Sequence, residues 1–362
     1  MAIKFVFVQI GTFTPPYLEG NLKRLSQIFP TNDIYLITNH PLLLRLEIRN
    51  INVVKYSTCS EHEFLLKNLS NRVDFREGFW RLSLERLLAL TRFQIQNQID
   101  HLLHLESDVL IFPNFPVELL QKHNDLLWCQ YNSELDVASL LYSPNVKSAL
   151  YLQQSIENQL RLGKIQTDMS LLNTIRQNND SKVSLFPSAP DKESQVINGK
   201  SEISLNSRLQ ISSKYEVFGG IFDPAAIGVW LLGKNPENTH ALLTLHDRWI
   251  IESGDSYIDP SKIDFVYDSD GLVFFTENET QIPIFNLHVH SKDLKVLSLD
   301  WVNAVDKFVR LSRIKDPIKR FDKKIFKELL VLNFKRGKLT EFLATMPWIY
   351  SIRMKIRKIL PN

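Results

Sequence analysis

The order of apolar segments along the chain predicts an α/β protein with an open sheet flanked by helices. Short apolar runs that suit buried strands alternate with longer segments whose apolar residues recur at helical spacing. This alternation is typical of folds in which helices lie on the faces of a sheet. A chain of 362 residues can bury a large core, and its two cysteines, Cys59 and Cys129, exclude a disulfide-rich scaffold.

The elements expected from this pattern follow in chain order. Short apolar runs predict strands at residues 4–10, 33–38, 52–56, 101–112, 262–266, 273–275 and 283–290. Apolar residues at helical spacing predict helices at 21–28, ahead of Pro30, and at 79–98. Residues 177–214 are polar and predict an insertion, which is either a mobile loop near a substrate or a surface excursion. Ligands of open α/β sheets bind beyond the carboxyl ends of the strands, so polar residues at these ends carry most of the functional information.

The formal net charge of +3 is the sum of two parts with opposite charge. Residues 1–300 carry 27 Lys and Arg against 35 Asp and Glu, a net charge of −8, whereas residues 301–362 carry 16 against 5, a net charge of +11. Beyond Arg313, apolar residues recur at intervals of three and four, with lysines on the other face. We therefore expect an α/β domain over residues 1–300 and a basic amphipathic helical tail over 301–362.

The basic tail suits the surface of an anionic membrane, because basic amphipathic helices bind there through charge and apolar area together. The alternative is a helix that packs on the acidic domain. Nucleic acid is not expected as a partner, since no recognised binding module accompanies the charge. No apolar run is long enough to predict a transmembrane helix, and the N-terminus lacks the cleavage site of a signal peptide. The sequence predicts a cytoplasmic protein, peripheral at the inner face of the membrane if the tail binds there.

An acidic triplet interrupts the apolar strand expected at 101–112. Glu106 and Asp108 stand two residues apart, so both carboxylates point to the same side of an extended chain. Two carboxylates beside a buried strand are costly unless a cation compensates their charge. Carboxylate oxygens are preferred ligands of Mg²⁺ and Mn²⁺. The alternative is a turn between two strands, with both acids in solvent.

Two histidines and a lysine share one side of the strand expected at 283–290. His288 and His290 alternate with apolar residues, and Lys292 follows on the same side. A strand-borne imidazole can complete the coordination of an ion that a carboxylate already holds, and the lysine can neutralise a phosphate. A zinc site is less favoured, because neither an H-E-x-x-H motif nor a cysteine partner accompanies the two histidines.

The E-S-D triplet at 106–108 and the later H-x-H-S-K strand at 288–292 resemble, in this order, motifs of bacterial GT-A-type glycosyltransferases. The resemblance covers about residues 1–295. It implies a GT-A-like, Rossmann-type open sheet that binds a nucleotide-diphosphate sugar donor. It also implies a cofactor, Mn²⁺ or Mg²⁺, that bridges the two donor phosphates.

The resemblance assigns roles to the residues of both motifs. Asp108 would be the main metal ligand, and Glu106 would contact the metal or the sugar-ribose portion of the donor. His290, rather than His288, would be the other protein ligand because it adjoins the Ser-Lys pair. Lys292 would contact the donor phosphates. Glutamate in place of the first aspartate is a departure from the family pattern.

Two further segments match the family in position. Arg86, on the helix expected at 79–98, corresponds to an arginine that reaches the donor; the alternative is a solvated surface charge. Asp168 precedes an apolar helical run and resembles the family's helix start, whose aspartate binds sugar hydroxyls. The alternative for Asp168 is a helix cap or a first-turn acid.

The resemblance also implies roles near the acceptor and the nucleotide. Asp223 lies in an F-D-P-A-A-I-G segment and would be the general base of an inverting enzyme; the alternative is that it caps a helix. Gln9, Gly11 and Thr12 follow the first strand and, by position alone, would lie beside the nucleotide base.

The implied activity is transfer of a sugar from a nucleotide-diphosphate donor to a hydroxyl of a glycan or lipid-linked acceptor, in cell-surface polysaccharide or glycolipid synthesis. An inverting enzyme needs a base to deprotonate the acceptor, whereas a retaining enzyme does not, and both outcomes are open. The alternative is a catalytically silent sugar-nucleotide-binding or scaffolding protein with the same fold. Glu106 favours that alternative, as does Val229-Trp230, where the family often has Gln-Tyr.

Overall fold

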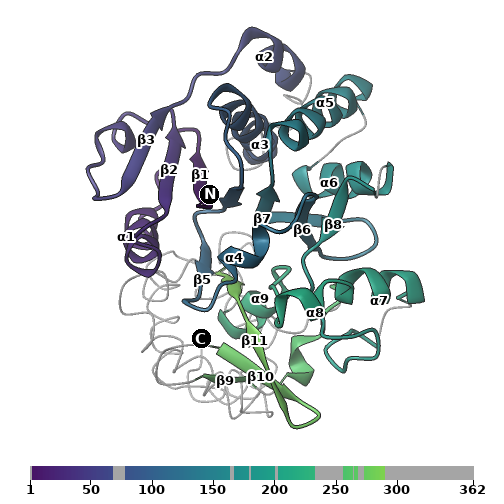
Figure 1. The fold of residues 1–362 in the computed structure, drawn as a ribbon. Helices are drawn as coiled ribbons and strands as arrows, with labels where there is room; N and C mark the ends of the chain where they lie inside the picture. The colour runs from purple at the N-terminus through teal and green to yellow at the C-terminus, as the bar shows by residue number, and fades with distance from the viewer. Residues whose placement is uncertain are drawn as a thin grey trace, which may run out of the picture.

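The computed structural model describes residues 2–67, 78–163, 167–178, 181–199, 203–232, 256–263, 265–267 and 273–289 (Figure 1). Among these residues the largest sheet has seven strands in the order β3-β2-β1-β4-β7-β6-β8. The strands are β1 Lys4–Gln9, β2 Asp33–Thr38, β3 Ile51–Lys55, β4 Leu102–Leu105, β6 Leu126–Gln130, β7 Asp136–Ser143 and β8 Val183–Leu185. β1, β2, β3 and β4 run parallel, and β7 is antiparallel to both β4 and β6.

The helices among the described residues are α1 Leu18–Ile28, α2 Ser60–Lys67, α3 Phe79–Gln96, α4 Val117–Leu120, α5 Val146–Leu162, α6 Asp168–Asn178, α7 Leu205–Ser212, α8 Tyr215–Phe218 and α9 Ala226–Leu232. Of these, α3 packs against β1, and α5 and α6 pack against β7. α3 and α5 lie side by side (Figure 1). Val6 and Val8 of β1 belong to the core that contains the buried leucines of α3, whereas Phe5 and Phe7 belong to the core under α1. Successive side chains of a strand point to opposite faces, and the predicted open α/β sheet flanked by helices is confirmed.

Two small sheets complete the described fold. β5 Val109–Ile111 pairs antiparallel with β12 Asn286–His288, and β9 Phe265–Tyr267, β10 Val273–Glu277 and β11 Thr280–Ile284 form the other. The strand expected at 101–112 is β4 and β5, interrupted by the acidic triplet as the sequence predicts. The strand expected at 283–290 is not a single strand, because the chain leaves one sheet and enters the other at Phe285. There the Phe285 N–H donates to Ile221 O at 3.0 Å, while its carbonyl accepts from the N–H of Phe112 at 3.1 Å.

The polar insertion expected at 177–214 needs correction where the structure describes it, at 181–199 and 203–214. β8 extends the main sheet by pairing in parallel with β6. α7 also lies in this segment. The buried apolar residues of the described segment are Val183, Leu185, Phe186, Ala189, Val196, Ile197, Ile203 and Ile211. The polar composition hid these residues because they occur singly or in pairs between polar stretches rather than at a regular period.

The basic tail expected at 301–362 lies outside the described residues. In the part of the chain that the structure describes, no helix is both long enough and apolar enough to span a membrane.

Candidate functional site

The acidic triplet forms the turn between β4 and β5. The Val109 N–H donates to Glu106 O at 3.1 Å, and the Glu106 N–H donates to Ser139 O of β7 at 3.0 Å. This turn follows the carboxyl end of β4, next to β1, which is where open α/β sheets place their ligands. Asp108 is buried, whereas Glu106 is partly exposed. The alternative, in which both acids lie in solvent, is wrong for Asp108 because this residue is buried.

β12 places His288 against this acidic turn. His288 pairs with Val109 of β5, and the Val289 N–H donates to Asp108 O at 2.8 Å. The Nε2 atom of His288 lies 3.2 Å from Oδ2 of Asp108 and 3.4 Å from Oε2 of Glu106. The ligand atoms of Glu106, Asp108 and His288 all lie within 4.8 Å of one another. We call these three residues the acidic-histidine cluster.

The donor set of the acidic-histidine cluster fits a divalent cation. Carboxylate oxygens are ligands that Mg²⁺ and Mn²⁺ prefer, and an imidazole nitrogen is a ligand of transition metals. Two carboxylates beside a buried imidazole also leave negative charge that a cation would compensate. The sequence motifs therefore meet in space as a candidate metal centre.

Arg86 joins the cluster to α6. Its guanidinium lies 2.5 Å from Oε1 of Glu106 and 3.0 Å from Oδ2 of Asp168, the first residue of α6. Glu106 thus uses one oxygen for Arg86 and turns the other toward His288. The side chain of Arg86 is only 15% exposed, so the reading of a solvated surface charge is wrong.

Burial and charge act in opposite directions on this ion-pair network. Burial alone would lower the pKa of Arg86, but Glu106 and Asp168 raise its pKa above the ordinary value, so the guanidinium remains charged. Burial raises the pKa of Asp168, and Glu106 acts in the same direction, while Arg86 lowers it. Arg86 is therefore the group that allows two acids to approach one another here.

Asp223 is fully buried, with 0% of its surface exposed. Its carboxylate accepts three backbone hydrogen bonds, from the N–H groups of Ile227 at 2.8 Å, Gly228 at 2.7 Å and His288 at 2.9 Å. Burial raises the pKa of Asp223, and these hydrogen bonds act in the opposite direction. A general base has to reach the proton that it removes, so this position matches the alternative reading, a cap on α9.

The loop after β1 lies at the same edge of the sheet as the acidic turn. The Gly11 N–H donates to Oδ1 of Asn39, which follows β2, at 3.0 Å. Gly11 has a φ of +102°, a conformation that favours glycine. Gln9 donates to Phe13 O at 2.9 Å, and the carbonyl of Thr12 lies 3.1 Å from Nε2 of His40. The loops after β1 and β2 are thus tied together beside the strand ends.

Sequence reasoning missed His104. It is fully buried on β4, two residues before Glu106, and its Nδ1 donates to Val6 O at 2.9 Å. Burial and the charge of Arg86 lower the pKa of His104 to about 3, so it is neutral beside the ion-pair network. Strand periodicity, which places residues 104 and 106 on one side, was the available signal. His290 and Lys292, both expected in the site, lie outside the described residues.

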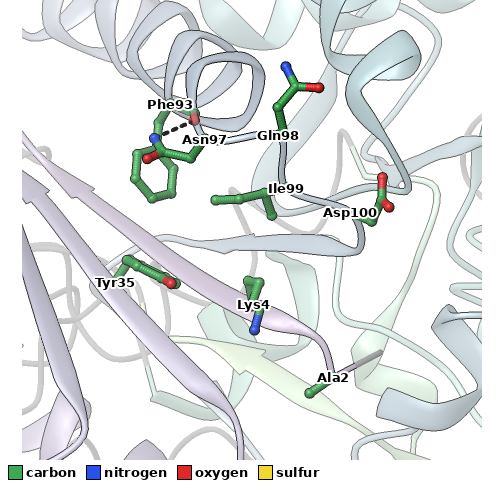
Figure 2. Close-up of a pocket in the computed structure, with 8 residues that line it drawn as sticks. All are labelled: Ala2, Lys4, Tyr35, Phe93, Asn97, Gln98, Ile99 and Asp100. Atoms are coloured by element: carbon green, nitrogen blue, oxygen red, sulfur yellow. Dashed lines mark hydrogen bonds between the residues drawn. The ribbon is translucent and has the colours of Figure 1, made fainter.

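A cavity of about 440 Å³ lies at the other end of β1 (Figure 2). It is lined by Ala2, Lys4, Tyr35, Phe93, Asn97, Gln98, Ile99 and Asp100. Asn97 donates to Phe93 O at 2.9 Å, and Lys4 is paired with Asp33. No residue expected in the functional site lines this cavity.

No family model matches the chain, and no curated protein matches its sequence. Solved structures similar to it include glycosyltransferases. The PaToxG glycosyltransferase overlaps 60% of this chain and 86% of its own, with a TM-score of 0.35 and 10% identity. The galactosyltransferase LgtC, in complex with donor and acceptor sugar analogues, overlaps 51% and 73%, with a TM-score of 0.33 and 12% identity. Mouse xyloside xylosyltransferase 1 overlaps 51% and 85%, with a TM-score of 0.34 and 9% identity.

All three are glycosyltransferases by name. Their identities and TM-scores are low, so the likeness assigns no residue and no substrate to this chain.

Proposed function

We propose that this chain is a metal-dependent glycosyltransferase. It would move a sugar from a nucleotide-diphosphate donor to a hydroxyl of a glycan or lipid-linked acceptor, in cell-surface polysaccharide or glycolipid synthesis. The observation that carries the proposal is the acidic-histidine cluster, in which two segments about 180 residues apart in sequence meet at the carboxyl end of β4.

In this proposal Asp108, Glu106 and His288 hold Mn²⁺ or Mg²⁺. A divalent ion bound there supplies positive charge that stabilises the leaving diphosphate. His290, the other histidine of the motif, is the alternative ligand to His288. The contacts of His288 with both carboxylates support His288 as the metal ligand.

The surrounding residues bind and orient the donor. The loop at 9–12 borders the nucleotide, and Arg86 keeps Glu106 and Asp168 in place. Asp168 then accepts hydrogen bonds from sugar hydroxyls. Lys292 neutralises a donor phosphate as a point charge. The loop after β1 and the acidic turn lie at the same sheet edge, which supports this division of roles.

The basic tail at 301–362 is proposed to bind a membrane surface. Its net charge of +11 against −8 for residues 1–300 supports binding to the inner, anionic face of a membrane. Such binding would keep a cytoplasmic enzyme close to a lipid-linked acceptor.

The test is release of nucleoside diphosphate by the full chain from a panel of nucleotide sugars with Mn²⁺. We expect Mn²⁺-dependent release with at least one donor, since many transferases slowly hydrolyse their donor in the absence of acceptor. Asp108→Asn should reduce this rate at least about 100-fold, because it removes a ligand charge from the centre. NMR of a transfer product would then show whether the anomeric configuration is inverted or retained.

Asp33→Asn is the matched control, because Asp33 lies at the opposite end of the parallel strands and pairs with Lys4. Its donor hydrolysis should equal that of the wild type. Donor binding in a thermal-shift assay without any hydrolysis would instead favour the catalytically silent sugar-nucleotide-binding protein.

A further inference from the structure

Asp223 connects two segments through a single buried carboxylate. Its Oδ1 accepts from the N–H of Ile227, and its Oδ2 accepts from the N–H groups of Gly228 and His288. Ile227 and Gly228 lie in the first turn of α9, whereas His288 is the last residue of β12. Both oxygens are therefore engaged by backbone donors.

The main chain before Asp223 runs beside the strand that carries His288. The Ile221 N–H donates to Pro283 O at 2.9 Å, and the Phe285 N–H returns a hydrogen bond to Ile221 O at 3.0 Å. The Asp223 N–H donates to Oδ1 of Asn286 at 3.1 Å. Asn286 is fully buried, so this hydrogen bond is shielded from water.

Gly228 sets how closely α9 approaches β12. A Cβ atom at this position would lie 2.1 Å from the carbonyl oxygen of His288 and 2.8 Å from Oδ2 of Asp223. Glycine therefore permits the short hydrogen bonds of Asp223, and the backbone of His288 has little freedom to move toward α9.

On its other side, β12 is held against the acidic turn. His288 pairs with Val109, and the next N–H in the chain, that of Val289, donates to Asp108 O. The backbone of β12 at His288 is thus held on one side by the hydrogen bond to the Asp223 carboxylate and on the other by the hydrogen bond to Asp108 O. Binding sites require their side chains to be held within about 0.5 Å, usually by the hydrogen bonds of neighbouring residues.

The geometry points to Asp223 as a positioning residue that holds His288 in the acidic-histidine cluster. It acts through the backbone N–H of His288 and contacts neither donor nor acceptor. This inference rests on the metal centre of the proposed function. It replaces the general-base role implied by the resemblance, because a fully buried carboxylate with three backbone partners is not available to an acceptor hydroxyl.

The test is Mn²⁺ binding to the full-length protein, measured by titration calorimetry. Asp223→Asn places an amide N–H₂ opposite backbone N–H donors, so β12 should shift relative to Asp108. We expect the dissociation constant of Mn²⁺ to rise about 10- to 100-fold, the usual cost of losing a residue that orients a metal ligand.

Asp136→Asn is the matched control for loss of stability. Asp136 is also fully buried and accepts hydrogen bonds from Trp128, Asn173 and Arg176. It is the first residue of β7, and its partners lie on β6 and α6 rather than in the cluster. It should lower the melting temperature and leave the dissociation constant of Mn²⁺ unchanged. An equal rise of the Mn²⁺ dissociation constant in Asp223→Asn and Asp136→Asn would overturn the positioning role.

Asn286→Ala is a second variant, used in case Asp223→Asn fails to fold. It removes the acceptor of the Asp223 N–H while the carboxylate remains, so the dissociation constant should rise by up to about 10-fold. Wild-type affinity in Asn286→Ala and in every folded Asp223 variant would refute the inference. Wild-type affinity with abolished transfer in Asp223→Asn would restore the general-base role. Failure of the wild type to bind Mn²⁺ would instead refute the metal centre itself.

Discussion

Arg86 is the shared partner of both acids in the ion-pair network, which no sequence pattern indicated. It lies between Glu106 and Asp168, and all three side chains are largely shielded from water. A buried pair contributes little compared with apolar packing, but removal of one partner leaves an uncompensated charge. The arginine that the sequence analysis expected either to reach the donor or to be a surface charge is thus the counter-ion of Glu106 and Asp168.

Substitution of Arg86 tests this arrangement. Arg86→Ala should lower the free energy of unfolding by about 3–5 kcal/mol, because both acids lose their cation. Urea denaturation of the full chain measures it. Arg161→Ala is the control, since Arg161 pairs with Glu61 but is 54% exposed, and a surface pair contributes about 0–1 kcal/mol. Equal losses in the two variants would show that the Arg86 network is not buried in solution.

At the scale of elements, the site depends on two strands of three residues each. β5 is entirely apolar, whereas β12 alternates polar and apolar residues. Local periodicity predicted apolar strands at both places, but it cannot predict that they pair with one another. That pairing places His288 beside Asp108, because it sets the register at His288 and Val109.

Helix α5 offers an element-scale prediction, since it packs on α3, which carries Arg86. The side chain of Asn145 caps α5 by accepting from the Ser148 N–H at 3.0 Å. Asn145→Ala should lower the free energy of unfolding by about 1 kcal/mol, whereas Asn145→Asp should keep the cap and the stability. Thermal or urea unfolding measures both. Equal stability of the two variants would contradict the cap.

At the scale of the whole molecule, the distribution of charge divides the chain into an acidic part and a basic part. The tail with a net charge of +11 follows a part with a net charge of −8. Each basic residue near an anionic bilayer contributes about 1 kcal/mol before screening by salt. The total of +3 therefore conceals a difference in charge between the two parts of the chain, on which the membrane proposal rests.

Removal of residues 313–362 tests the membrane proposal. The full chain should sediment with anionic vesicles at low salt, and the truncated chain should remain in the supernatant. Neutral vesicles and high salt are the controls, because both remove the electrostatic attraction. If the truncated chain sediments as fully as the full chain, another part of the protein binds the membrane. If the full chain does not sediment, the result favours a tail that packs on the acidic domain.

The sequence by itself predicted β1, β2, β3 and the strand that divides into β4 and β5, together with helices at α1 and α3, and it located the acidic turn and the histidine strand. It did not predict β6, β7 and β8 of the same sheet. The predicted features follow from local periodicity and residue chemistry, which a single segment contains. Tertiary structure decided that Arg86 joins Glu106 to Asp168, that His288 lies against Asp108, and that Asp223 is sealed inside. Each of these depends on which distant segments pack together, and packing is set by the summed contacts of the whole core rather than by any one segment.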